Sequence, residues 1–278
     1  MSELAEKLHA FSEQQPFKVG WYFKNLLSSE VFEFNGNRAF SAASTRKVPI
    51  LMAALNAVNQ ERINLDHAVE LTQKFQKNSS GCFWFLSPGI QLTLQDALNM
   101  MIVVSDNTCT GVLVDLLGRD FINDYSKNIG LNNTEIKAGF PPLGEENSAA
   151  YMDVMSPTDA GLILDLILAG SSRSDCASRL GCSTELCALA LAILQRQMLR
   201  TKLPYLLPAE ASVAHKTGTR LGVHNDIGII FRNGSPFFIL AVYTHNSSPD
   251  EYEKVLGCRF IAQLCRMCYD SLSEIHRT

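Results

Sequence analysis

Residues 211–244 read ASVAHKTGTRLGVHNDIGIIFRNGSPFFILAVYT, and three strand-like runs in this segment decide the fold class. The runs cover residues 211–216, 224–232 and 236–244. Asn233-Gly234 joins the last two runs, and this dipeptide is the strongest short-range signal for a tight β-hairpin. The segment therefore predicts antiparallel strands near the end of the chain.

The beginning of the chain predicts two more strands behind a first helix. Leu4, Leu8 and Phe11 follow helical spacing up to Pro16, which marks a stop. Two β-rich runs, 18–23 and 30–34, come next and predict a hairpin. Because neither group of strands is large enough to be stable alone, we expect early and late strands to form one antiparallel sheet of five strands.

A last helix follows the late strands. Ser248-Pro249-Asp250-Glu251 supplies an N-cap, a first-turn proline and a capping-box Glu. The apolar residues that follow recur at helical spacing on one face: Tyr252, Leu256, Phe260, Leu264 and Met267. The two ends of the chain are thus expected to flank the sheet with helices.

The middle of the chain has helical periodicity. Residues 44–58 and most of 92–170 show apolar positions three and four apart, so we expect an all-helical lobe inserted between the strands. The predicted fold is α/β in the broad sense (α+β). Residues 1–50 and 205–278 would form the sheet with its terminal helices, and residues 51–204 the helical part. The groove between the two parts is the expected place for a functional site.

Composition narrows the function classes. The 278 residues are 46% hydrophobic and 19% charged, with a net charge of -4 and no basic stripe, so nucleic acid is not an expected partner. The longest apolar run, 161–170, is interrupted by Asp165 and is too short to span a membrane. The acidic start lacks the pattern of a secretory signal, and we expect a cytoplasmic protein.

Eight cysteines lie mostly inside apolar helical runs, where a small buried thiol packs well, and we expect them to be reduced. Cys265-Arg-Met-Cys268 has the spacing of half a zinc site, yet no second CxxC or His pair accompanies it, which favours packing. No metal or cofactor is expected.

The first segment with chemical potential is Ser44-Thr45-Arg46-Lys47. A spacing of three at the start of a helix places the hydroxyl and the amine on one face, within reach for proton transfer. The free amides of the helix N-terminus are suited to an oxyanion. Alone, the same residues fit an N-cap Ser followed by a solvated Lys.

Two further segments are equally ambiguous alone. Ser105-Asp106-Asn107 interrupts an apolar run and suits a helix cap. Lys216-Thr217-Gly218-Thr219 stands at the end of a predicted strand, where Gly218 lets a substrate approach the backbone and the Lys and Thr suit a carboxylate.

Together and in this order, the three segments resemble the motifs of class A β-lactamases and penicillin-binding proteins. The chain is similar to a class A β-lactamase-like serine hydrolase over nearly its whole length. Other similar segments are Phe40-Ser41-Ala42-Ala43, Ser80-Gly81, Ser87-Pro88-Gly89 and Asn225-Asp226-Ile227-Gly228.

The resemblance implies a role for each motif residue. Ser44 would form an acyl-enzyme, Lys47 would take its proton, and Ser105 with Lys216 would protonate the leaving nitrogen. The oxyanion hole would be the backbone amides of Ser44 and Thr219. As a general base, Lys47 must be neutral, so its pKa should be lowered by burial and by Lys216.

The resemblance also implies the groups that bind the substrate. Asn107 would bind the substrate's side-chain amide, and Thr217 with Lys216 its carboxylate, beside Gly218 and Thr219. Arg220 is an unusual neighbour, which would meet an acidic substrate group or face solvent. Trp84 would stack on a substrate ring or cover the helical lobe.

The chain departs from the family where a loop Glu activates the deacylating water. Counting ten residues past Ile129-Gly130 leads to Phe140, which has no carboxylate. Glu145 and Glu146 follow, but Ala149 and Ala150 stand where an Asn is expected four residues later. Acylation should therefore survive while hydrolysis of the acyl-enzyme is slow.

The expected function is amide hydrolysis of a small molecule, a β-lactam or a peptide-like amide, through Ser44. Three alternatives stay open: a penicillin-binding-like D-alanyl peptidase, an acyltransferase for a small metabolite, and a sensor module without turnover. His215 and His224 flank the third motif, but strand alternation places His215 on the face opposite Lys216.

Overall fold

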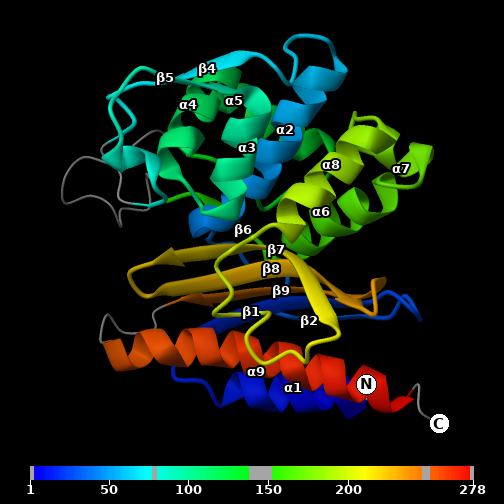
Figure 1. Ribbon diagram of the computed structural model, residues 1–278. Helices are drawn as coiled ribbons and strands as arrows, with labels where there is room; N and C mark the ends of the chain where they lie inside the picture. The colour runs from blue at the N-terminus through cyan, green and yellow to red at the C-terminus, as the bar shows by residue number, and fades with distance from the viewer. Residues whose placement is uncertain (1–2, 77–79, 138–151, 246–250, 276–278) are drawn as a thin grey trace.

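The computed structural model describes residues 3–76, 80–137, 152–245 and 251–275 (Figure 1). Its centre is a five-stranded sheet of order β2-β1-β9-β8-β7, in which every neighbouring pair is antiparallel. The strands are β1 (Lys18–Asn25), β2 (Val31–Phe34), β7 (Ala211–Arg220), β8 (Val223–Arg232) and β9 (Ser235–His245). The predicted union of early and late strands is confirmed, because β1 pairs with β9 along its whole length.

The third motif lies inside a strand rather than at its end. We expected the strand to stop at Lys216, but β7 continues to Arg220 and pairs with β8 throughout. The hairpin turns at Leu221-Gly222, where Gly222 takes the left-handed conformation (φ 69°) that glycine tolerates. Since β7 is the edge strand of the sheet, the motif lies along the edge of the sheet.

The two terminal helices cover one face of the sheet. α1 (Glu3–Glu13) and α9 (Glu251–Ile275) lie side by side across the strands (Figure 1). Their apolar faces form a core with the sheet that includes Leu8, Trp21 and Phe260. The predicted cap at Ser248 to Asp250 lies outside the described residues.

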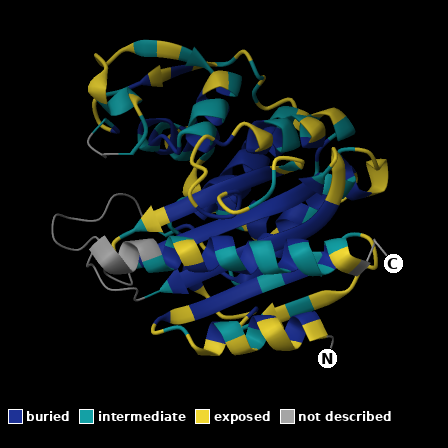
Figure 2. Ribbon diagram, turned by 60° about the horizontal axis from the view of Figure 1, so that its bottom comes forward, coloured by how far each residue is buried: buried dark blue, intermediate teal, exposed yellow. Residues whose placement is uncertain are grey.

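The helical lobe covers the other face. Its helices are α2 (Lys47–Asn59), α3 (Leu94–Val103), α4 (Asn107–Leu117), α5 (Arg119–Asn128), α6 (Pro157–Gly170), α7 (Ser174–Arg179) and α8 (Thr184–Gln195). Figure 2 shows buried residues along the strands between the outer helices and the lobe. The α+β class with a five-stranded sheet is therefore as predicted.

The lobe is not purely helical, which corrects the expectation from the sequence. β4 (Ala68–Leu71) pairs with β5 (Ile90–Thr93), and β3 (Phe40–Ser41) pairs with β6 (Val154–Met155). These strands have two to four residues, too few to stand out against the helical periodicity around them.

The division into two parts at residues 50/51 and 204/205 stays a prediction, and its first boundary falls inside α2. Among the described helices, none is both long and apolar enough to cross a membrane.

Candidate active site

Ser44 lies in the short 3₁₀ helix η1 (Ala43–Arg46), directly before α2. Ala43 takes a left-handed φ of 45°, an uncommon conformation for a residue with a Cβ. Thr45 fixes the segment to the sheet, since its hydroxyl donates to Ala42 O (2.7 Å) and lies 3.1 Å from the Tyr243 hydroxyl. Ser44 itself is half-buried and so accessible to a ligand.

Lys47, one turn after Ser44, is fully buried and points into the lobe. Its Nζ donates to Ser105 O (2.7 Å), to Ser105 Oγ (3.1 Å) and to Asn107 Oδ1 (2.8 Å). The first and second motifs are thus joined by three hydrogen bonds.

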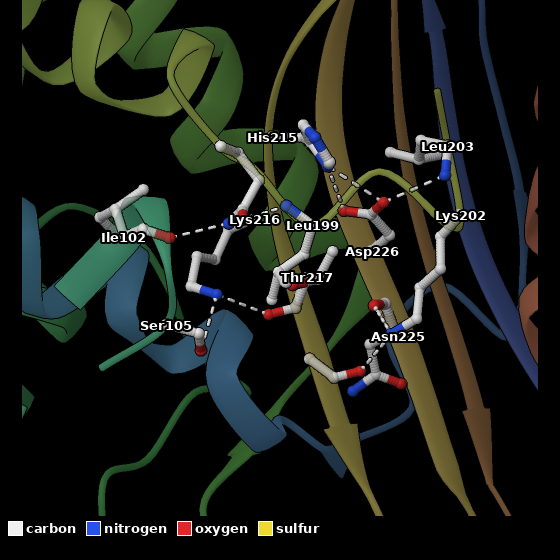
Figure 3. Close-up of polar contacts among 12 residues, drawn as sticks. Ile102, Ser105, Leu199, Lys202, Leu203, His215, Lys216, Thr217, Asn225 and Asp226 are labelled. Carbon is white, nitrogen blue, oxygen red and sulfur yellow. Dashed lines mark hydrogen bonds and ion pairs between the residues drawn. The ribbon is translucent and has the colours of Figure 1, made fainter. Parts of the chain in front are cut away.

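Lys216 reaches the same hydroxyl from the sheet. Its Nζ donates to Ser105 Oγ (3.0 Å) and to Thr217 O (2.8 Å), as Figure 3 shows. Ser105 Oγ therefore lies between two amines that come from different parts of the chain. Ser105 lies in the loop between α3 and α4 and has a left-handed φ of 59°.

Both amines lose part of their basicity in this environment. Burial lowers the pKa of Lys47 well below its usual value, and the neighbouring Lys216 and Arg46 charges lower it further. Burial also lowers the pKa of Lys216 to about 7, against a raising effect of Asp226. The direction predicted for Lys47, and both of its predicted causes, are confirmed.

Asp106, the middle residue of the second motif, has a positioning role. One carboxylate oxygen accepts from Cys109 N (2.9 Å) and caps α4. The other accepts from Cys82 N (2.8 Å) and Phe83 N (2.9 Å), which ties the preceding loop to the motif.

Gly218 allows β7 to pass close to the nucleophile segment. A Cβ at this position would lie 2.9 Å from Ala42 O and 3.2 Å from Ser44 N. The Asn225 side chain, opposite Gly218 on β8, donates to Ser41 O (2.8 Å) and Ala42 O (3.2 Å). Thr219 therefore follows directly after a position at which β7 lies close to the Ser44 segment.

Lys202 is a site neighbour that the motifs did not indicate. Its buried Nζ donates to Gly218 O (2.7 Å), Thr219 Oγ1 (2.8 Å) and Asn225 O (2.9 Å). Burial lowers its pKa. It lies in the connection between α8 and β7, and no residue pattern around it distinguishes it from a solvated lysine.

His215 lies away from the amines, as strand alternation predicted. It is fully buried, and its Nδ1 is 3.0 Å from Asp226 Oδ1. Asp226 Oδ2 also accepts from Leu203 N (3.1 Å). The pair of His215 on β7 and Asp226 on β8 is thereby bonded to the connection that precedes β7 (Figure 3).

Trp84 lies in η2 (Phe83–Phe85), the short helix that the Asp106 carboxylate holds by its first residue. Its ring packs against Phe85, with centroids 3.9 Å apart. The structure thus brings the Trp84 segment to the second motif, while a contact of the ring with substrate stays a prediction.

The three motifs converge within the described part of the chain. Phe140, Glu145 and Glu146 lie outside the described residues. In the described part of the chain, no group of three or more His, Cys, Asp and Glu side chains is arranged to hold a metal ion.

Comparison with known proteins adds a family match. The family model described as "Beta-lactamase enzyme family" matches residues 3–272. Among curated proteins, the extended-spectrum β-lactamase PER-1 of Pseudomonas aeruginosa is 25% identical over 224 residues, 75% of this chain and 68% of PER-1. A β-lactamase of Bacteroides uniformis is 23% identical over 288 residues, 98% of this chain and 92% of that protein.

Several solved structures are similar in fold to nearly the whole of this chain. PBP-A matches with a TM-score of 0.85 and 27% identity, covering 99% of this chain and 97% of that one. A mutant of PBP-A, described as an acyl-enzyme complex with penicillin G, also has a TM-score of 0.85 and 27% identity, covering 98% and 96%. A β-lactamase from Sphaerobacter thermophilus matches with a TM-score of 0.83 and 27% identity, covering 97% and 96%.

Proposed function

The chain belongs to the beta-lactamase enzyme family and is a serine hydrolase of amide bonds, and on this basis we propose that Ser44 forms an acyl-enzyme that is released slowly. The substrate class that we propose is a β-lactam or a small peptide-like amide. The observation that carries the proposal is the placement of two amines with lowered pKa on the hydroxyl of Ser105.

The amines of Lys47 and Lys216 transfer the protons during acylation. On losing a proton, Lys47 gives up one of its three donated hydrogen bonds and gains a lone pair. This neutral amine takes the proton of Ser44 as the Ser44 Oγ attacks the carbonyl carbon, and the carbonyl electrons move to oxygen. When the tetrahedral intermediate collapses, the C–N bond breaks and the nitrogen receives a proton from Ser105, which Lys216 replenishes. The contacts of Ser105 Oγ with both lysines support this relay.

The developing oxyanion is held by the backbone amides of Ser44 and Thr219. The proximity of Gly218 to Ser44 N supports this assignment, because the strand brings its backbone to the nucleophile there. Each donor in such a site contributes roughly 3 kcal/mol to lowering the barrier. Lys202, bound to Gly218 O and Thr219 Oγ1, fixes this part of β7.

Substrate binding uses the remaining motif residues. Lys216 and Thr217 bind the carboxylate of the substrate, and Asn107 binds its side-chain amide while it accepts from Lys47. Trp84 stacks on a ring of the substrate. These roles rest on the resemblance and on the convergence of the three motifs.

The proposal of slow release rests on the amino-acid sequence between α5 and β6. Phe140 stands where relatives carry a carboxylate that activates water, and Glu145 and Glu146 lack the companion Asn. The similarity to PBP-A, whose mutant is described as a penicillin G acyl-enzyme complex, supports a long-lived adduct.

The test is incubation with a fluorescent penicillin, followed by intact-mass measurement over time. We expect one adduct on wild type that persists for many minutes, and a loss of roughly 10³-fold or more in its formation rate in Ser44→Ala. Ser273→Ala, a distant serine bonded to Tyr269 O in α9, is the matched control and should label like wild type.

Two results would contradict the proposal. Absence of an adduct on wild type rules out penicillin acylation at Ser44. Release within seconds rules out slow deacylation and favours efficient β-lactam hydrolysis.

A further inference from the structure

A cavity of about 310 Å³ lies between β3 and the turn that joins β7 to β8. Its described lining includes Ser41, Arg220, Val223 and His245, and no described residue of the lining is acidic. We call it the Arg220 cavity. The groups that line it are not used by the acylation chemistry described above.

The register of the sheet explains why cations gather there. Arg220 pairs with Val223, Val223 with His245, and His245 with Lys18, so these side chains form one row across four strands. Arg220 also shares its face of β7 with Gly218, because side chains alternate along a strand. That face is the one that meets the Ser44 segment.

The pKa of His245 reflects the positive charges near the cavity. Burial lowers the pKa of His245, and the neighbouring charges of Lys18, Arg38 and Arg220 lower it further. Burial, and to a smaller extent the charge of Arg220, lowers the pKa of Arg46 to about 10, while the Arg46 guanidinium pairs with Asp153. Among the described residues that line the cavity, Arg220 carries a permanent positive charge, which favours a bound anion.

A second observation points to a ligand in the same place. Ser41 is buried, 1% exposed, and its Oγ has no hydrogen-bond partner among the described residues. Its backbone carbonyl is already bound by Asn225. A buried hydroxyl without a partner is costly, and an anionic oxygen in the cavity would satisfy it.

We propose that the Arg220 cavity binds a second carboxylate of the substrate, carried on the acyl side of the scissile amide. Arg220 directly follows Thr219, about 3.3 Å further along the strand, and Ser41 comes three residues before Ser44. A group in the cavity therefore lies within reach of an acyl substituent. The inference rests on the proposed function, which it deepens by naming an acidic substrate class.

The test compares two penicillins that differ by one carboxylate on the acyl side chain, benzylpenicillin and carbenicillin. We expect carbenicillin to acylate wild type roughly tenfold faster at low concentration, the scale of one charge-assisted hydrogen bond. This ratio should fall as salt is added, because the attraction is screened. Competition against a fluorescent penicillin measures both rates.

Variants test which residues cause the preference for carbenicillin. Arg220→Gln should bring the ratio close to one, and Ser41→Ala, which removes only the buried hydroxyl, should lower it two- to fivefold, roughly the effect of one lost hydrogen bond. Arg232→Gln is the matched control, since Arg232 lies at the opposite end of β8 over the Phe237 ring, and it should keep the wild-type ratio. Melting temperatures show that each variant is folded.

The inference is overturned if wild type acylates equally fast with both compounds, or if Arg220→Gln and Ser41→Ala keep the preference for carbenicillin. No adduct with either penicillin contradicts the proposed function itself, and the inference falls with it. Equal, efficient acylation by both compounds contradicts the inference alone.

Discussion

At the scale of single residues, the site depends on the unequal charge states of two neighbouring lysines. Both amines donate to Ser105 Oγ, and burial makes it costly for both to be protonated together. Pairs of groups whose surroundings separate their pKa values divide the roles of acid and base. Here Lys47 is suited to accept a proton, and Lys216 to hold one near neutral pH.

The pH dependence of acylation should be bell-shaped. The rate rises with pH as Lys47 loses its proton, and falls above about pH 7 as Lys216 loses the charge that holds the substrate carboxylate. Acylation rates from pH 5 to 10 measure the profile. Lys216→Arg keeps its charge to high pH and should lose the alkaline limb, so an unchanged alkaline limb in this variant would refute the assignment.

The same lysine should make stability depend on pH. With a pKa of about 7 in the folded state and 10.5 in the unfolded state, Lys216 binds more proton in the unfolded state between these values. The free energy of unfolding therefore rises with pH in this window, by up to about 1.4 kcal/mol per unit. Urea unfolding at pH 7 and pH 9 measures the rise.

Lys216→Met should lose that increase. Lys74→Met is the control, because Lys74 forms an exposed pair with Asp115 and should leave the slope of wild type unchanged. Identical slopes in wild type and Lys216→Met would show that Lys216 remains protonated in the folded protein.

Residue patterns anticipated the motif side chains but not their supports. Ser44, Ser105 and Lys216 stand in recognisable segments, and the structure brings these segments together. Lys202 stands in no such segment, because its role depends on where the α8–β7 connection crosses β7 and β8. Such a crossing is a property of the folded chain, which local sequence does not encode.

At the scale of elements, β7 approaches η1 closely at Gly218, where we propose that the substrate carbonyl lies. Gly218→Ala should lower the acylation rate about tenfold or more, because its Cβ would lie 2.9 Å from Ala42 O and the strand must move outward. Overpacking of this kind costs roughly 1–3 kcal/mol of stability. Rates with a fluorescent penicillin and urea unfolding measure both effects.

A matched control for this change is Gly234→Ala in the β8–β9 turn. An added Cβ there meets nothing within 4 Å, while the left-handed φ of 79° still strains the backbone. It should lower stability without slowing acylation. Equal acylation by wild type and Gly218→Ala would show that the oxyanion site does not need this close approach.

Helices and strands were predicted correctly where the pattern of apolar residues was long and uniform. The apolar residues of β8 and β9 and the Asn233-Gly234 turn made their hairpin evident. The second half of β7 is polar because it carries the motif, so its strand character is set by pairing with β8 rather than by composition. Tertiary pairing overrode local preference at the functional site.

At the scale of the whole molecule, the sheet and the lobe share one core. Ile227, Ile239 and Tyr243 of the sheet belong to the same apolar cluster as Leu51 of α2 and Ile163 of α6. The other face of the sheet forms the second cluster with α1 and α9. The sheet is therefore packed on both sides and contributes residues to both clusters, so the lobe and the outer helices are joined through it.

We expect the described parts to unfold in a single transition. Ile227→Ala should lower the free energy of unfolding by roughly 2–5 kcal/mol, and calorimetry and circular dichroism should show the same midpoint. Ile261→Ala in α9, from the second cluster, should shift the same transition. Two separate transitions, with each variant shifting only one, would contradict a shared core.

The order of the strands also bears on biosynthesis. β1 is synthesised long before its partner β9, so the central sheet cannot close until β9 has left the ribosome. A nascent chain that ends before β7 carries Ser44 without Lys216 or the strand that lies against it. Chemical reactivity at the serine is thereby deferred until β7 has been made and has folded against it.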